Sequence, residues 1–482
     1  MKQKISPLIL AVIAAALVVA GGFAVQTVRS TGALSSVLPV AMPVAMPDPG
    51  SPPGGTYTTE LGNRNAFADP GAPLTPEERR AFSFGNRLFN TNWTTAPGSV
   101  KSFDGLGPVF NRVSCSGCHT RDGRGRPPLE SETDFDSLLI RVSVPGKDVD
   151  GGPKPHPAYG DQINDRSILG VPAEAKVHVA WTSVDGTYAD GTRYELTKPT
   201  FTLSDPAFGP FGSDLMMSPR VANQVFGLGL LEVVYAEDIL KRADPDDADH
   251  DGISGRPNWV MDPVSGKKAL GRFGWKANQP TLLAQDTGAA RGDIGLSTSL
   301  RPDQNCPPAQ TACAAAITGG EPELSDDFVD RLVTYSRTLA VPARRNPTDP
   351  AVLAGQKIFA SIGCAACHTP TMVTGHAAAP ITLANQTIHP FTDLLLHDMG
   401  PDLADGRPDY EATGSEWRTP PLWGIGLIPQ VNGHDRLLHD GRARGVAEAI
   451  LWHGGEGEAS RERFRALSAK ERDSLVAYVS SL

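Results

Sequence analysis

The chain is poor in basic residues and in cysteine. Its 44 lysines and arginines are outnumbered by 54 aspartates and glutamates, which leaves a net charge of −10 at pH 7. Nucleic-acid-binding proteins need a basic face, so this balance argues against a nucleic-acid partner. An acidic surface keeps a protein soluble and can attract a basic protein partner. Glycine and proline are plentiful, with 50 and 42 residues, and predict long ordered loops.

Four of the six cysteines form two copies of one pattern. The copies are Cys115-Ser-Gly-Cys118-His119 and Cys364-Ala-Ala-Cys367-His368. Cys-x-x-Cys-His is the attachment signature of c-type haem, in which the thiols form thioethers and the histidine ligates the iron. A zinc site would need further Cys or His near each copy, and a thioredoxin motif lacks the trailing histidine. The sequence therefore predicts two covalently bound haems, with His119 and His368 as proximal ligands.

The two remaining cysteines, Cys306 and Cys313, flank a short polar stretch. A disulfide between them would close a small loop and stabilise the fold by restricting the unfolded chain. A redox-active dithiol is the functional alternative. The structural disulfide is the preferred interpretation, because c-type haem and disulfides both occur outside the cytoplasm.

The N-terminus has the pattern of a secretory signal. Lys2 and Lys4 precede an apolar run over residues 8–20, and small residues follow up to Ala24. This pattern predicts a signal peptide over residues 1–24 and a periplasmic protein. An uncleaved membrane anchor is the alternative, because the apolar stretch is nearly long enough to span a bilayer.

Composition divides the rest of the chain into three parts. Residues 25–60 are rich in proline and predict an extended or disordered linker. Residues 61–345 are expected to form an N-terminal haem domain with a long insert, and residues 346–482 a C-terminal cytochrome c domain. The predicted fold class is mainly α, with two cytochrome c-like domains, long loops and a few short strands in the insert.

Capping signals and apolar periodicity indicate individual elements. Thr75 and Pro76 predict the start of a helix through residues 79–89, and a capping box at Ser468 and Glu471 predicts a C-terminal helix. Further expected elements are helices over residues 221–240, 328–339 and 351–359, and short strands over 141–144 and 176–181.

Eight further motifs are distinctive. They are Gly107-Pro-Val-Phe-Asn-Arg-Val-Ser-Cys115, Arg124-Gly-Arg-Pro-Pro128, Gly227-Leu-Gly-Leu-Leu-Glu232, Asp249-His-Asp-Gly-Ile-Ser-Gly-Arg-Pro-Asn258, Phe273-Gly-Trp-Lys-Ala-Asn-Gln279, His397-Asp-Met-Gly-Pro401, His439-Asp-Gly-Arg442 and Trp452-His453-Gly-Gly455. Together they resemble the di-haem oxidoreductase family of bacterial peroxidases, from about residue 75 to the end. The architecture is more distantly similar to bacterial di-haem cytochrome c peroxidases.

This resemblance implies one peroxidatic haem and one haem that stores or relays an electron. Peroxidase chemistry needs an acid–base group beside an open iron. Glu232, in an apolar run, is the candidate beside the His119 haem, because the matching region of the peroxidases supplies their catalytic glutamate. The structural alternative is a Glu232 paired with Arg220 or Arg272.

The sixth ligand of the His368 haem has four candidates: Met399, His397, His439 and His453. The related peroxidases carry a ligand where this chain has Glu416-Trp417, and tryptophan cannot ligate iron. His453 is preferred, because the two glycines after it let the backbone approach a flat macrocycle, and Met399 is second. His439 is expected to bond a haem propionate.

The acidic segment of Asp247, Asp249 and Asp251 reproduces the first half of an EF-hand loop, and a solvated acidic turn is the alternative. The related peroxidases bind a calcium ion between their haems, which implies Ca²⁺ here. Trp275, or less favourably Trp259, is the expected relay between the haems, although core packing is the simpler role for both.

Three functions agree with these patterns. The leading one is a peroxidase that takes electrons from a small cytochrome c or a cupredoxin and uses peroxide or another small oxidant. The second is a non-catalytic electron-transfer cytochrome with six ligands on both irons. The third is a haem dioxygenase similar to the rubber-cleaving di-haem proteins. Glu232 beside the His119 haem would favour the peroxidase, a cavity without any acid would favour the dioxygenase, and a His or Met on both irons would favour electron transfer.

Overall fold

The computed structural model describes residues 44–129, 137–378 and 380–482. The predicted signal peptide and the first part of the predicted linker, residues 25–43, lie outside these ranges. Within them, no helix has both the length and the apolar character that a bilayer crossing requires.

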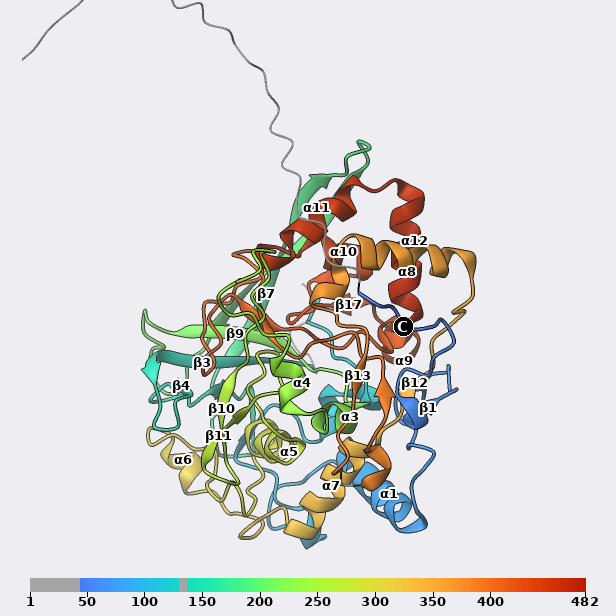
Figure 1. Ribbon diagram of the computed structural model, residues 1–482. Coiled ribbons are helices and arrows are strands. Elements are labelled where there is room, and N and C mark those ends of the chain that lie inside the picture. The colour runs from blue at the N-terminus through green and yellow to red at the C-terminus, as the bar shows by residue number, and fades with distance from the viewer. Residues whose placement is uncertain (1–43, 130–136, 379) are drawn as a thin grey trace, which may run out of the picture. The chain divides into compact units, whose positions relative to one another are not determined.

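Twelve α-helices occur in the described ranges (Figure 1). They are α1 (Pro76–Asn90), α2 (Cys115–Cys118), α3 (Leu228–Glu232), α4 (Ala236–Leu240), α5 (Leu282–Ala289), α6 (Thr311–Ala314), α7 (Asp326–Thr338), α8 (Pro350–Ser361), α9 (Ile428–Asn432), α10 (Val446–Leu451), α11 (Glu458–Ala466) and α12 (Ala469–Ser481). The predicted helices over 79–89, 328–339 and 351–359 and the C-terminal helix are confirmed as α1, α7, α8 and α12.

The two capping boxes explain where α1 and α12 begin. The Thr75 hydroxyl accepts a hydrogen bond from Glu78 N at 3.2 Å, and the Glu78 carboxylate accepts one from Thr75 N at 2.7 Å. Glu471 accepts the equivalent bond from Ser468 N at 2.9 Å. These bonds satisfy amide groups that have no partner inside the helix.

The helices α1 and α7 cross at a glycine. A Cβ atom at Gly85 would lie 2.2 Å from the Arg331 carbonyl oxygen and 2.6 Å from Tyr335 Cβ. One turn later, the Phe89 ring packs against the Tyr335 ring, with centroids 5.4 Å apart. Only a residue without a side chain allows the two backbones to approach so closely.

The helices α8 and α12 repeat this arrangement in the C-terminal half. A Cβ atom at Gly355 would lie 2.0 Å from the Ser474 carbonyl oxygen and 2.6 Å from Tyr478 Cβ. The Phe359 ring packs against the Tyr478 ring at 5.4 Å. Each half therefore has a first helix and a last helix crossed at a glycine, with one Cys-x-x-Cys-His motif between them.

The prediction of a mainly α fold is wrong. Of the described residues, 29% are helical and 20% are in strands. The strands are β1 (Thr58–Thr59), β2 (Val109–Phe110), β3 (Leu138–Lys147), β4 (Pro153–Lys154), β5 (Gln162–Ile163), β6 (Arg166–Ser167), β7 (Lys176–Thr187), β8 (Arg193–Ser204), β9 (Met216–Val221), β10 (Trp259–Asp262), β11 (Lys267–Leu270), β12 (Val341–Pro342), β13 (Met372–Val373), β14 (Thr387–Ile388), β15 (Leu396–Asp398), β16 (Glu416–Arg418), β17 (Arg436–Leu437) and β18 (Ala443–Arg444).

The longest strands extend well beyond the segments predicted for them. Strands β7 and β8 pair over twelve residues as an antiparallel hairpin, and β3 pairs with β4, β5 and β9. The outer half of the hairpin is polar, so it lacks the apolar alternation that marks a half-buried strand. Cross-strand backbone bonds hold it, and such bonds leave no signal in the sequence.

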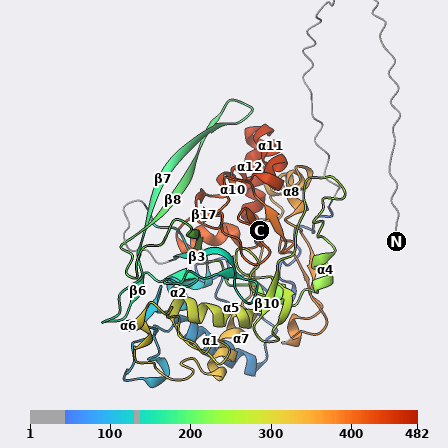
Figure 2. The ribbon, with the colours of Figure 1, turned by 90° about the vertical axis from the view of Figure 1, so that its left-hand side faces the viewer.

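The hairpin also touches the C-terminal helices (Figure 2). Arg465 of α11 donates to the Thr187 carbonyl oxygen at 2.8 Å, and Arg472 of α12 pairs with Asp190 at 2.7 Å. Thr197 N of β8 donates to Glu448 of α10. An insert in the first half of the chain thus covers the second half.

The predicted helix over residues 221–240 is also wrong. Two five-residue helices, α3 and α4, occupy this segment. Gly227 precedes α3 with a left-handed φ of 74°, a conformation that glycine adopts without strain. The apolar run reflects burial of the segment rather than one continuous helix.

The described part of the predicted linker, residues 44–60, is packed onto the C-terminal half. The Pro47 carbonyl oxygen accepts a hydrogen bond from Gln356 at 2.8 Å, and the Pro53 carbonyl oxygen accepts one from His389 N at 2.7 Å. Tyr57 is fully buried in a hydrophobic cluster that includes residues of α1, α7, α8 and α12. Cys306 and Cys313 form a disulfide.

Candidate functional site

The first haem motif lies in a buried cavity, which we call the His119 cavity. Cys115, Cys118 and His119 all line it. The Nδ1 atom of His119 lies 2.6 Å from the Asn223 carbonyl oxygen, and this contact fixes the ring orientation. Burial lowers the pKa of His119, so the neutral imidazole, the form that binds metals, is favoured.

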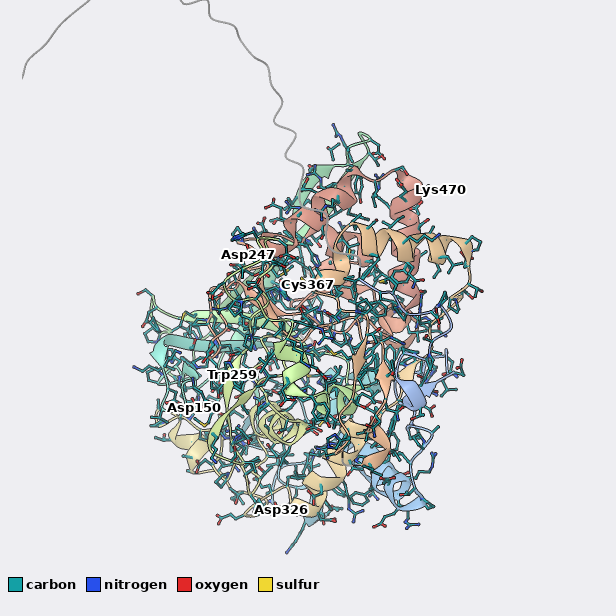
Figure 3. The ribbon with its side chains drawn as sticks, in the orientation of Figure 1. Asp150, Asp247, Trp259, Asp326, Cys367 and Lys470 are labelled. Carbon is teal, nitrogen blue, oxygen red and sulfur yellow. A yellow bond between two sulfur atoms is a disulfide. The ribbon has the colours of Figure 1, made fainter. Side chains whose placement is uncertain are left out.

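The second motif lies in an equivalent cavity, the His368 cavity, which Cys364, Cys367 and His368 line. Figure 3 labels Cys367. The Nδ1 atom of His368 lies 3.0 Å from the Phe391 carbonyl oxygen. Burial lowers the pKa of His368 to about 4, and the nearby His453 adds to this effect. Both histidines therefore keep Nε2 available to a metal.

Both cavities also fit the anionic side of a haem. The guanidinium groups of Arg124, Arg272 and Arg418 line them and donate to backbone carbonyl oxygens. Among the described residues, none of the three has a carboxylate partner within 4 Å. Burial lowers the pKa of each to about 10. Propionate groups would supply the missing negative charge.

The His368 cavity contains a second histidine that can bind iron. His453 lines it, and its Nδ1 atom lies 2.7 Å from the Ala449 carbonyl oxygen. This is the same kind of contact that orients His368, and it leaves Nε2 of His453 unoccupied. Burial lowers the pKa of His453. Met399 lines the same cavity.

The other two predicted candidates have different surroundings. Both nitrogens of His397 contact carboxylates, Nε2 with Asp393 at 2.8 Å and Nδ1 with Glu456 at 2.6 Å. The neighbouring Cys367 sulfur and the Asp393 carboxylate raise the pKa of His397 well above its usual value, against the effect of burial. A protonated imidazole has no lone pair for iron, so His397 is a poor ligand.

His439 is held by stacking. Its ring lies parallel to that of Trp417, with centroids 3.7 Å apart. The Lys276 ammonium lies 4.4 Å from the centroid of the Trp417 ring, and it pairs with Asp405 at 3.0 Å. Both rings line the His368 cavity, so Trp417, at the site of the missing family ligand, forms part of its wall.

The His119 cavity has no equivalent second ligand. Of the described residues that line it, His119 is the only histidine, and none is a methionine, lysine or tyrosine. The two cavities are therefore chemically different. The His368 cavity has a second histidine with a free Nε2 atom in its lining, and the His119 cavity has one proximal histidine with polar side chains around it.

Glu232, the predicted acid–base residue, does not line this cavity. Its Oε2 atom pairs with Arg337 at 2.7 Å, and its Oε1 atom accepts a hydrogen bond from Leu282 N at 2.8 Å. The expected alternative, a glutamate paired with an arginine, is close to what the structure shows, although the partner is Arg337 rather than Arg220 or Arg272.

Asp286 is a cavity residue that the sequence motifs do not reveal. It lines the His119 cavity from α5, and its Oδ2 atom has no hydrogen-bond partner among the described residues. Burial raises its pKa to about 7. The sequence offered one weak signal for Asp286 as a cavity residue. It is a single aspartate in an apolar stretch that follows Thr281, whose hydroxyl caps α5.

The two cavities share a wall. Gln224, Trp275, Arg418, Pro420 and Pro421 line both. Trp275 is buried, and its indole nitrogen donates to the Val221 carbonyl oxygen at 2.8 Å. Of the two tryptophans considered as relays, Trp275 is thus the one between the cavities. Trp259 lies on β10 (Figure 3) and lines neither cavity.

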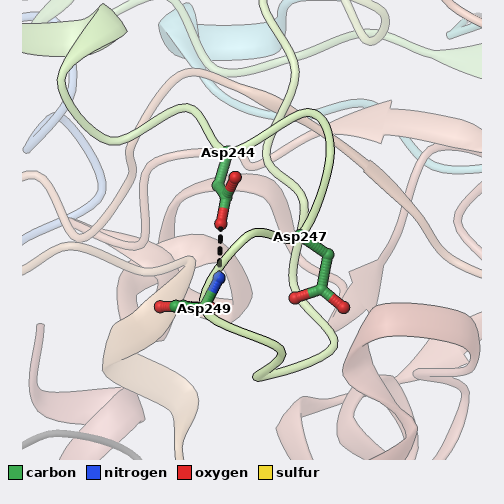
Figure 4. A group of neighbouring side chains, drawn as sticks. All are labelled: Asp244, Asp247 and Asp249. Carbon is green, nitrogen blue, oxygen red and sulfur yellow. Dashed lines mark hydrogen bonds between the residues drawn. The ribbon is translucent and has the colours of Figure 1, made fainter.

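The acidic loop gathers a different set of carboxylates from the predicted one (Figure 4). Oxygens of Asp244, Asp247 and Asp249 lie within 4.8 Å of one another, and Asp251 is not in this group. The Asp251 carboxylate instead accepts a hydrogen bond from Ile253 N at 2.8 Å. The EF-hand template missed Asp244, which precedes the repeat.

A sequence model described as "Di-haem oxidoreductase, putative peroxidase" matches residues 50–482. The chain belongs to this di-haem oxidoreductase family. Membership confirms the resemblance seen in the motifs, and it supports two haems and an oxidoreductase activity. Searches among curated proteins and among solved structures gave no match.

Proposed function

We propose that this di-haem oxidoreductase is a periplasmic peroxidase, with its catalytic haem in the His119 cavity and its electron-transfer haem in the His368 cavity. The difference between the two cavities carries the proposal. His453 offers a second ligand beside His368, whereas the described lining of the His119 cavity offers none besides His119. An iron with one strong protein ligand can bind a small oxidant.

The side chains around each cavity have separate tasks in this proposal. When bound, a haem supplies reversible one-electron chemistry and a position at which a peroxide can be activated. Asn223 and Phe391 orient His119 and His368 through their carbonyl oxygens. Trp275 lies in the wall between the cavities and shortens the path for an electron.

The acid content of the His119 cavity favours the peroxidase over the dioxygenase. Reduction of hydrogen peroxide to two waters consumes two electrons and two protons, so it needs a group that moves protons. Asp286 and Asp293 are both in the lining. The electrons would come from a small cytochrome c or a cupredoxin.

Export to the periplasm is part of the proposal. The N-terminal signal pattern supports it, and so does the disulfide between Cys306 and Cys313, because disulfides persist in oxidising compartments. Covalent attachment of both haems is supported by the thiol pairs that line the two cavities beside His119 and His368.

A calcium ion in the acidic loop is a further part of the proposal. The group of Asp244, Asp247 and Asp249 offers oxygen ligands, which a hard cation prefers. The loop is joined to the His368 cavity, because Ser254 donates to Glu456 at 2.6 Å and Glu456 lines that cavity.

Low-temperature EPR of the purified ferric protein tests the proposed function. We expect one high-spin signal from the His119 haem and one low-spin signal from the His368 haem. Peroxide should then oxidise a reduced donor protein with a yield of two electrons per peroxide. Two low-spin signals from the oxidised protein, together with no high-spin signal after half-reduction, would contradict the proposal and leave an electron carrier.

A further inference from the structure

Asp286 is placed where a proton-transfer group would act. It belongs to α5, whose residues Gln285, Asp286 and Ala289 line the His119 cavity. The Oδ2 atom of Asp286 is buried and has no hydrogen-bond partner among the described residues. A buried polar atom without a hydrogen-bond partner is rare in a folded protein, and a catalytic role is one of the reasons for which such an atom is retained.

The charged groups that face Asp286 come from three elements. On α7, Ser336 contacts the Asp286 carboxyl and Arg337 lies near it. Glu232 approaches it from α3, and the Cys115 thiol approaches it from α2. Arg337 pairs with Glu232 rather than with Asp286. Burial raises the pKa of Asp286 to about 7, and the charge of Glu232 adds to the effect. The group can therefore exchange a proton near neutral pH.

In each half, a helix that ends at or carries a cavity residue packs against the last helix. In the C-terminal half, α10 packs against α12 and leads directly to His453, the candidate second ligand of that cavity. In the N-terminal half, α5 packs against α7 and contributes Asp286. A helix packed against the last helix of its half thus leads to a candidate ligand in one cavity and carries a carboxyl group in the other.

Glu232 cannot act in the same way, because both of its oxygens are occupied. Its Oε1 atom accepts the hydrogen bond from Leu282 N, the first amide of α5, and its Oε2 atom accepts from Arg337. A carboxylate at a helix N-terminus stabilises the helix. Glu232 therefore fixes the helix that carries Asp286.

We propose that Asp286 is the acid–base residue of the His119 cavity and that Glu232 is a positioning residue for it. The inference rests on the proposed peroxidase function and gives that site its missing proton carrier. Asp286 takes a proton from one oxygen of hydrogen peroxide and returns it to the other, which leaves as water. The remaining oxygen takes two electrons from the donor protein and two protons from solvent and leaves as a second water.

The test uses the haem-loaded protein and the variants Asp286→Asn, Asp286→Glu and Glu232→Gln, with the exposed Asp330→Asn on α7 as a matched control. For Asp286→Asn we expect an unchanged high-spin EPR signal and a loss of about 10²–10⁴-fold in peroxide turnover. Asp286→Glu should recover part of the loss. Glu232→Gln should keep more activity and shift its pH profile to lower pH, because a negative charge near Asp286 is removed.

Infrared difference spectroscopy over a pH titration gives a readout that is independent of turnover. Protonated-carboxyl absorption should disappear near neutral pH in the wild type and in Asp330→Asn, and the share that belongs to Asp286 should be missing from Asp286→Asn. Asp122, whose pKa burial also raises to about 7, contributes a share that remains in every variant. If Asp286→Asn turns over peroxide at the wild-type rate, or its difference spectrum equals that of the wild type, Asp286 is not the proton carrier, although the peroxidase proposal stands. If the wild type gives two low-spin EPR signals when oxidised and no high-spin signal when half-reduced, both proposals fall.

Discussion

Replacement of Asp286 by asparagine should change how stability depends on pH. The carboxyl has a pKa of about 7 in the fold, against the usual 3.8, so the folded protein binds this proton more tightly than the unfolded chain. A carboxyl whose pKa is higher in the folded protein than in the unfolded chain makes the protein less stable as the pH rises from the unfolded pKa to the folded pKa. Below 3.8 and above about 7, their contribution no longer changes.

The magnitude follows from the two pKa values. One pKa unit corresponds to 1.36 kcal/mol, so the interval between 3.8 and about 7 sets an upper limit of roughly 4 kcal/mol. Asp286 faces a cavity rather than densely packed protein, and a more polarisable surrounding reduces such effects. We therefore expect roughly 2 kcal/mol.

Denaturant unfolding of the haem-loaded proteins at pH 4 and pH 8 measures this effect. Asp286→Asn does not titrate, so its unfolding free energy relative to wild type should rise by about 2 kcal/mol between the two pH values. The exposed Asp330→Asn should follow the wild type. Parallel curves for Asp286→Asn and the wild type would refute the buried, proton-binding carboxyl on which the inference depends.

The remaining predictions concern the second cavity, the helix crossing and the acidic loop. His453→Ala should convert the low-spin EPR signal of the His368 haem to high-spin, whereas Met399→Leu should leave it unchanged; the reverse result would make Met399 the ligand. Gly355→Ala places a Cβ atom 2.0 Å from a carbonyl oxygen of α12, so the free energy of unfolding in denaturant should fall by about 1–3 kcal/mol. The control Gly62→Ala adds a Cβ atom with nothing within 4 Å, and it should change the free energy of unfolding by less than about 0.5 kcal/mol. If the loop binds calcium, EGTA should remove about 2 kcal/mol of stability from the wild type and none from Asp247→Asn; a wild type that does not respond would leave the loop a solvated turn.

Local signals in the sequence predicted the helices that begin with a cap. The Thr75 and Ser468 boxes depend only on residues three positions apart, and their helices start where expected. The hairpin of β7 and β8 was underestimated, because backbone pairing between the two strands, from Thr182 with Lys198 to Thr187 with Arg193, holds its polar outer half. The run over 221–240 shows the opposite error: burial made it apolar, and Gly227 divided it.

The sequence by itself determined the two haem motifs, because both thiols and the histidine that fit one haem lie within five consecutive residues. Only the tertiary structure decided what surrounds each motif. His453 reaches the His368 cavity from 85 residues beyond His368, and Asp286 reaches the His119 cavity from an unremarked helix. Glu232 had the sequence context of a buried acid, yet Arg337 and the first amide of α5 occupy its oxygens. Ligation and acid–base chemistry depend on contacts between distant segments, and no local pattern encodes those contacts.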